Sequence, residues 1–207
     1  MLLVSSTIIA VGDYEISPFF FSDHPIMGMG KEWSVANAVV TAPTILRLNN
    51  HHTISMGNRR IVFGWQAQKD TQLENLESLP DKLTYLVRSY FKHLQGVEYT
   101  AFGINFRVVI VPSNLELMDE FLSKNSSLGE MKYIVSFDPF TMNNTLTKAY
   151  PESNESAPLG VIFNANFHCN LEDIEVGMRL DFCRDILNER ESCFDRLKEE
   201  LNEINLA

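Results

Sequence analysis

The sequence has few cysteines and no long hydrophobic run. Its 207 residues include three cysteines, Cys169, Cys183 and Cys193, and no two of them have CxxC spacing. An odd number of cysteines without that spacing is typical of reduced thiols, so we expect a cytoplasmic protein. The apolar runs fall short of the roughly 20 residues of a membrane span, and the start of the chain lacks the cationic region of a signal peptide. We therefore expect a soluble protein without a membrane partner.

Positive charge is scarce as well. Lysine and arginine number 17 against 27 aspartates and glutamates, which gives a formal net charge of −10. Such a field repels phosphate backbones, so we expect no nucleic-acid partner. Much of the imbalance is local, because the segment 172–203 holds eleven carboxylates and five cations. The acidity therefore belongs mainly to the C-terminal part of the chain.

Motifs for nucleotides and metals are incomplete. The GMGK segment at 28–31 precedes Glu32, where a phosphate-binding loop needs Ser or Thr, and Pro25 stands where its first glycine is required. None of the five histidines has the HxH or HxxxH spacing of paired metal ligands. We therefore expect no metal and no cofactor, and the sequence leans against an enzyme. An enzyme of unknown type stays open, because catalytic groups can assemble from distant segments.

Hydrophobic patterns of both strand and helix type are present. Apolar residues at three-and-four spacing predict a helix over 79–95, and alternation predicts a strand over 98–111. Further strands are expected at 2–10, 45–49, 53–56, 59–66, 131–138, 145–150 and 159–169, a short helix at 113–124 and a loop at 150–158. The sequence thus predicts an α+β fold with a mainly antiparallel sheet and helices on one face.

The two halves of the chain share one order of elements. Residues 1–96 and 97–207 each contain a strand, a short ambiguous element, three strands and an amphipathic helix. This pattern indicates two pseudo-repeated β-x-β-β-β-α halves, although they share no residue-level identity. We expect both halves to belong to a single domain, 1–207.

An apolar seam runs along the acidic C-terminal segment. Nine positions from Val176 to Ile204 step by four and three alternately, and eight of them are apolar, the exception being Arg190. The pattern predicts a long helix whose end beyond Arg190 can extend past its own domain. The candidate residues for a homodimer interface are Phe194, Leu197, Leu201 and Ile204. Two alternatives stay open: the whole seam packs on the chain's own sheet, or Gly177 and Arg190 divide the helix.

Two predicted strands carry polar residues on the side opposite to their apolar residues. On 98–111 and 159–169 these residues are Asn105, Arg107, Asn164, Asn166 and His168. If the strands are neighbours, the shared face combines carboxamides, one fixed cation and one imidazole, which suits a polar or anionic small molecule. The alternative is a solvated sheet surface, because antiparallel sheets often leave one face in water.

Two functions of different classes follow from these features. The patterned acidic helix favours a non-enzymatic assembly or protein-interaction module, which forms a homodimer or binds another protein. The polar face favours a small-ligand-binding protein, with a pocket between sheet and helix. The sequence identifies no ligand and no partner.

Overall fold

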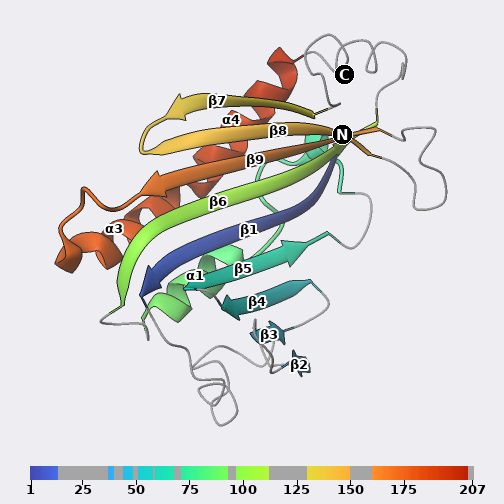
Figure 1. Ribbon diagram of the computed structural model, residues 1–207. Helices are drawn as coiled ribbons and strands as arrows, with labels where there is room; N and C mark the ends of the chain where they lie inside the picture. Colours follow the sequence, from blue (N-terminus) through green and yellow to red (C-terminus); the bar gives the residue numbers. More distant parts are fainter. Residues whose placement is uncertain are drawn as a thin grey trace.

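The computed structural model describes residues 1–13, 37–39, 44–48, 51–57, 59–67, 71–92, 97–111, 130–149 and 160–204. They form a nine-stranded sheet with helices along one side (Figure 1). The strand order is β2-β3-β4-β5-β1-β6-β9-β8-β7, and all neighbouring strands pair antiparallel. The expected α+β fold with an antiparallel sheet is confirmed.

The elements follow the hydrophobic patterns closely. The strands are β1 (Leu2–Asp13), β2 (Asn37–Val39), β3 (Thr44–Arg47), β4 (His52–Gly57), β5 (Arg60–Gln66), β6 (Glu98–Ile110), β7 (Glu130–Phe137), β8 (Phe140–Ala149) and β9 (Gly160–Asn170). The helices are α1 (Leu83–Phe91), α3 (Arg179–Ile186) and α4 (Arg190–Glu203), with 3₁₀ turns at Leu73–Asn75, Val176–Met178 and Leu187–Glu189. None of these described helices has the length and apolar character that crossing a membrane requires. The short helix expected at 113–124 and the loop expected at 150–158 lie outside the described residues.

The central strands of the sheet are β1 and β6, the first strand of each half of the chain. Outward from β1 lie β5, β4, β3 and β2, and outward from β6 lie β9, β8 and β7. Each half then ends in helix, α1 after β5 and α3 with α4 after β9. The first half thus has four strands outward from β1 and the second has three outward from β6, so the expected repeat is matched only in part. The duplication and the single domain stay predictions.

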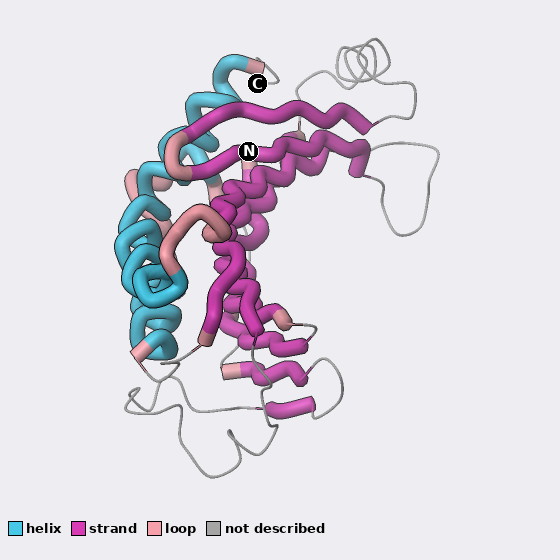
Figure 2. Tube along the Cα trace, turned by 60° about the vertical axis from the view of Figure 1, so that its left-hand side comes forward, coloured by secondary structure: helices cyan, strands magenta, loops and turns pink. Residues whose placement is uncertain are grey.

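The sheet is curved, and its two faces differ. Figure 2 shows the helices along the convex side, while the concave side is turned away from them. Because none of the described helices covers the concave side, we call it the free face. It is formed by the strand residues that alternate with the core residues, for example Thr7 on β1, Asn105 on β6 and Asn166 on β9.

The core lies between the sheet and the helices. On β6, Phe102, Ile104 and Phe106 are buried, as the alternation predicts, and so are Leu86 and Phe91 on α1. The ring centroid of Phe106 lies 6.0 Å from that of Phe167 on β9 and 5.8 Å from that of Phe194 on α4. The aromatic residues of both layers thus pack the C-terminal helix onto the centre of the sheet.

The C-terminal helix is long, but the 3₁₀ turn Leu187–Glu189 divides it into α3 and α4. Gly177 lies in the preceding turn, Val176–Met178. The buried seam residues are Cys183, Leu187, Arg190, Phe194, Leu197 and Leu201. Both open alternatives therefore describe part of the structure: the seam packs on the chain's own sheet, and the helix is divided just before Arg190.

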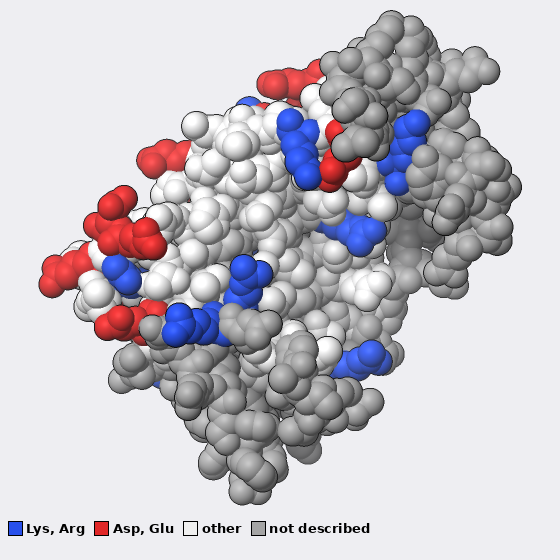
Figure 3. Space-filling model, in the orientation of Figure 1, with Lys and Arg blue, Asp and Glu red and all other residues white. Residues whose placement is uncertain are grey.

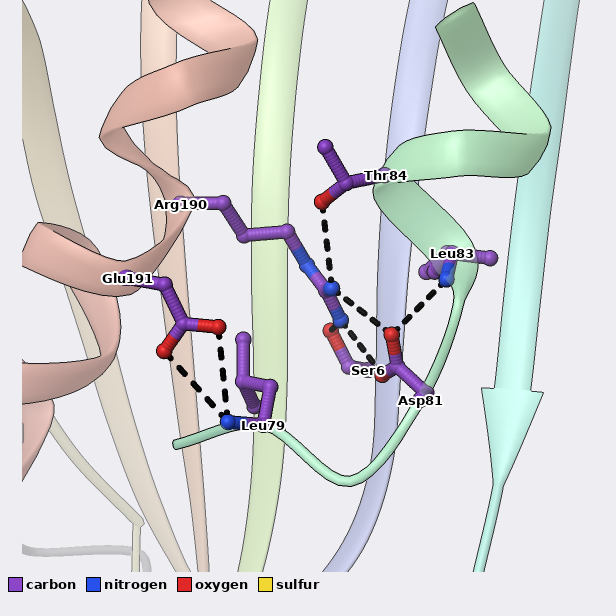
Figure 4. A network of polar contacts seen from close by, with 7 residues as sticks. All are labelled: Ser6, Leu79, Asp81, Leu83, Thr84, Arg190 and Glu191. Atoms are coloured by element: carbon purple, nitrogen blue, oxygen red, sulfur yellow. Dashed lines mark hydrogen bonds and ion pairs between the residues drawn. The ribbon is translucent and has the colours of Figure 1, made fainter. Parts of the chain in front are cut away.

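Arg190 stands in the apolar seam because it has a buried partner (Figure 4). Its Nη1 and Nη2 donate to Asp81 Oδ1 and Oδ2 at 2.8 and 2.6 Å, and Nη2 also donates to Ser6 Oγ at 2.9 Å. The N–H of Leu83, in the first turn of α1, donates to Asp81 Oδ1 at 2.8 Å. With 3% and 0% of the two charged side chains exposed, this pair connects α4, α1 and β1 inside the core.

Several boundaries differ from the predictions. Helix α1 begins at Leu83 and not at residue 79 as predicted. At this start the Asp81 carboxylate accepts a hydrogen bond from the Leu83 N–H. Strand β8 begins at Phe140 rather than at 145, because its long pairing with β9 outweighs the low strand propensity of the Asn143–Asn144 pair. The strand predicted at 53–56 is β4, which begins one residue earlier, at His52.

Candidate functional site

The five polar residues predicted as a site lie together on the free face. Strands β6 and β9 are neighbours and pair antiparallel. The paired residues are Arg107 with Asn164, Asn105 with Asn166, and Gly103 with His168. Directly opposite residues of such a pair have Cβ atoms about 5 Å apart, so these side chains form one cluster. Their role in binding stays a prediction.

Alternation along each strand places this cluster. Phe106 points into the core between Asn105 and Arg107, and the buried Ala165 separates Asn164 from Asn166 in the same way. Because successive residues of a strand point to opposite faces, burial of the apolar residues directs the polar ones to the free face.

The cluster forms a shallow pocket of about 290 Å³ over β1, β6 and β9. Its lining residues are Ser5, Thr7, Asn105, Phe106, Arg107, Asn164, Ala165 and Asn166. Four of the five predicted residues line it, and His168 lies beside it on β9, two residues beyond Asn166. The pocket is on the free face. The prediction of a pocket between sheet and helix, made for a small-ligand-binding protein, does not describe this pocket.

Ser5 and Thr7 are site residues that the sequence prediction missed. The signal was present, because the polar Ser5 and Thr7 flank Ser6, which points into the core. The sequence alone does not show which strand pairs with β1. Only the register of β1 with β6, with Ser5 opposite Arg107 and Thr7 opposite Asn105, brings them into the pocket.

The floor of the pocket is held by a hydrogen bond between two strands. Asn105 Nδ2 donates to Thr7 Oγ1 at 3.0 Å. Asn105 Oδ1 is buried and has no hydrogen-bond partner within the described part of the chain. The carboxamide is therefore fixed on one side and retains an acceptor on the other.

Arg107 is exposed, and no described carboxylate pairs with it. Three arginines on the helix side do have carboxylate partners, since Arg184 and Arg196 pair with neighbouring carboxylates and Arg190 pairs with Asp81. An exposed guanidinium that no protein anion occupies keeps its N–H donors available to a ligand.

Cations collect on the free face although the chain as a whole is acidic. Free-face strand residues with positive charge are Arg47, Arg60, Arg107 and Lys132. The described carboxylates there, Glu98 and Glu130, are the first residues of their strands, and Glu130 lies 3.1 Å from Lys132 Nζ. Figure 3 looks onto this face, with blue side chains distributed across it and most of the red ones near its margins. The face is thus the more positive side of the sheet.

The three cysteines and the potential metal ligands of the described residues offer no reactive thiolate and no metal site. Cys169, Cys183 and Cys193 are free thiols buried on the core side. Burial raises the pKa of Cys183 to about 12 and raises the pKa of the other two thiols as well, which disfavours the reactive thiolate. Among the same residues, no three His, Cys, Asp or Glu side chains are grouped so that they could hold a metal ion.

The four candidate interface residues lie inside the fold. Phe194, Leu197 and Leu201 are at most 1% exposed, and Ile204 is partly buried against the same core. They contact the chain's own sheet rather than a free surface. Self-association stays a prediction, but Phe194, Leu197 and Leu201 cannot mediate it while α4 is packed.

No protein-family model matches the chain, and no curated protein is significantly similar to its sequence. An antiparallel sheet covered by helices can host many unrelated activities, so the fold alone assigns none. Function is therefore inferred from the chemistry of the free face.

Proposed function

We propose that this protein is a ligand-binding protein whose free face binds an anionic group, a carboxylate or a phosphate, at Arg107. The observation that carries the proposal is the exposed Arg107 guanidinium, which has no described carboxylate partner and lies in a pocket beside Asn105 and Asn164. A guanidinium presents parallel N–H donors that match two oxygens of a carboxylate or phosphate.

The residues around Arg107 supply the polar contacts that orient a ligand. Asn164 and Asn166 each offer a donor and an acceptor, and Ser5 and Thr7 add hydroxyls. A mixed set of this kind accommodates an anion that also carries amide or hydroxyl groups. The pocket is shallow, so we expect affinity to depend on charge and hydrogen bonds more than on apolar burial.

The alternative of a self-associating module has less support. It depended on an exposed apolar seam beyond Arg190, and the seam residues Leu197 and Leu201 pack in the core. We therefore rank ligand binding first.

The test is a titration of protein carrying ¹⁵N-labelled arginine side chains with glutarate and, separately, with inorganic phosphate. Binding is expected to shift the Arg107 Nε–Hε signal, and Arg107→Ala should weaken affinity about tenfold or more, the value of a charge-assisted hydrogen-bonded contact. The arm with the tighter binding identifies the anionic group. Arg107→Lys keeps the charge but loses the bidentate geometry, so it should fall between the two proteins.

Arg60→Ala is the matched control, because it removes the same charge from the same face outside the pocket lining. Its affinity should stay within about twofold of the parent, since exposed charges beyond a Debye length are screened. Equal urea midpoints for the three variants establish that each one folds. If Arg107→Ala binds both anions as well as the parent protein does, the proposed site is wrong.

A further inference from the structure

We propose that the anionic ligand is an acidic polypeptide segment that lies in extended conformation across the free face, from Arg47 on β3 past Arg107 on β6 to Lys132 on β7. The inference rests on the proposed function, because Arg107 is its central anchor. It adds the class of ligand, the direction in which the ligand lies and two further contact residues.

The register of the sheet aligns polar residues in two adjacent rows at right angles to the strands. The first row is Arg47, Thr53, Gly64, Thr7, Asn105, Asn166, Asn143 and Ile134. The second row is Gln66, Ser5, Arg107, Asn164, Thr145 and Lys132. We call these two rows the transverse track. It consists mainly of hydroxyl and carboxamide side chains, with one cation near each end and one between them. Lys132, the cation on β7, also contacts Glu130 at 3.1 Å, and 68% of its side chain is exposed.

The spacing of the three cations corresponds to that of side chains on an extended polypeptide. Strand β6 lies four steps from β3 and three from β7 in the strand order, which at the usual strand separation gives about 19 Å and about 14 Å. An extended chain advances about 3.3 Å per residue, so these spans equal about six and about four residues. Both numbers are even, so the matching carboxylates project from the same side of the peptide.

The polar groups of the transverse track favour a polypeptide backbone. Asn143, Asn164 and Asn166 offer N–H donors and C=O acceptors side by side on β8 and β9. An extended peptide has unpaired backbone N–H and C=O groups that such carboxamides can satisfy. A helical ligand satisfies those groups internally, so it gains less from this surface.

Single-stranded nucleic acid fits the same face less well. Proteins that bind it stack its bases on aromatic side chains. In the described strands, the aromatic residues point to the helix side, as Trp65 on β5, Tyr99 on β6 and Phe167 on β9 do. The free face therefore offers charge and hydrogen bonds without a stacking surface.

The shape and charge of the sheet agree with this orientation. Its concave curvature turns both ends of the transverse track toward a ligand lying over the middle (Figure 2). The acidic helices lie on the opposite side, so a negative peptide approaches the more positive face (Figure 3). The same distribution of charge disfavours binding of the peptide on the helix side.

The experiment compares two labelled peptides by fluorescence anisotropy. Each has about 11 residues, long enough to span the transverse track, and contains three glutamates in a serine and threonine background. The spaced peptide carries them at positions 1, 7 and 11, and the clustered peptide at positions 1, 2 and 3. The two have the same composition and charge, and the spaced peptide is expected to bind about tenfold more tightly because it alone reaches all three cations.

Substitutions separate the transverse track from the general charge of the face. Arg107→Ala should weaken both peptides, whereas Arg47→Ala should weaken the spaced peptide about three- to fivefold and leave the clustered one unchanged. Arg60→Ala removes an equal charge away from the transverse track: Arg60 lies four residues along β5 from Gly64, a distance of about 13 Å. It should bind both peptides as the parent protein does.

The outcomes distinguish this inference from the proposed function. Equal affinity for the two peptides, equal losses for Arg47→Ala and Arg60→Ala, or tighter binding of a single-stranded oligonucleotide of the same charge would each overturn the extended-peptide inference. In those cases the anion site at Arg107 survives if Arg107→Ala still weakens glutarate or phosphate binding. If Arg107→Ala changes the binding of no anion, the proposed function fails together with this inference.

Discussion

The helix-covered face and the free face belong to the same strands but treat polar groups in opposite ways. On the helix-covered face the buried charge of Arg190 is matched by Asp81 in a two-point ion pair. On the free face Arg107 has no described carboxylate partner. A buried charge must be paired, since desolvation without a partner costs several kcal/mol, whereas an exposed cation can remain available to a ligand.

Adjacent residues on one strand show the difference most directly. Phe106 fills the core between β9 and α4, while Arg107 lines the pocket on the opposite side. Substitutions on the helix-covered face should therefore change stability, and those on the free face should change binding.

Leu197→Glu places a carboxylate in the core beneath the sheet, where Leu197 is 0% exposed. The cost of an unpaired buried charge, several kcal/mol, adds to the lost packing and is comparable to the whole stability of an ordinary domain, about 5–15 kcal/mol. We expect the variant to be unfolded by circular dichroism. Ile134→Glu is the control, because Ile134 is 70% exposed on the free face, and it should change stability by no more than about 0.5 kcal/mol. A folded Leu197→Glu protein would mean that α4 does not pack as described.

Asp81→Ala leaves the Arg190 guanidinium buried without its partner. The free energy of unfolding should fall by about 3–5 kcal/mol in urea titrations. Asp181→Ala, which removes the exposed partner of Arg184, should cost less than about 1 kcal/mol. Adding Arg190→Met to the Asp81→Ala variant should recover part of the loss, because the unpaired charge is then gone. Equal losses for Asp81→Ala and Asp181→Ala would contradict a buried pair.

Phe106→Ala and Asn105→Ala compare neighbouring residues that point to opposite faces. Phe106→Ala removes a ring that contacts Phe167 and Phe194, so it should cost about 3–5 kcal/mol. Asn105→Ala removes one hydrogen bond to Thr7, so it should cost about 1 kcal/mol. Chemical denaturation of both variants measures the difference. Similar losses at the two positions would contradict the division between the faces.

His52 should make a smaller, pH-dependent contribution from the helix-covered side. Burial lowers the pKa of His52 below its ordinary value of 6.5. The unfolded chain therefore binds a proton at a higher pH than the folded one does, and stability should fall as pH decreases below 6.5 toward the lowered pKa. His52→Gln should show a shallower fall over that interval, measured as urea-unfolding free energy against pH. Identical pH profiles would exclude this linkage.

Local pattern was sufficient for much of the architecture. Alternation located β6 and β9, and helical spacing located α1 and the C-terminal helix. The same alternation separated Phe106 from Arg107, so the faces of individual strands were predictable. Burial of one apolar face imposes this pattern on each strand without reference to its neighbours.

The hydrophobic pattern could not predict which distant strands and side chains pair with each other. Ser5 and Thr7 enter the pocket only because β1 pairs with β6, about a hundred residues later. Arg190 reads as a break in an apolar seam until Asp81, 109 residues away, is found beside it. Periodicity describes one element at a time, whereas partners across the fold depend on how the elements pack together.

The most direct test of the central claim is an NMR titration of ¹⁵N-labelled protein with the spaced acidic peptide. We expect shift changes at the Arg107 Nε–Hε group and at the backbone amides of Asn105, Asn164 and Asn166, and they should be lost in Arg107→Ala but kept in Arg60→Ala. Residues of α3 and α4 that face solvent should not respond. Changes confined to the helices, or shifts on the free face that persist in Arg107→Ala, would contradict a binding site at Arg107.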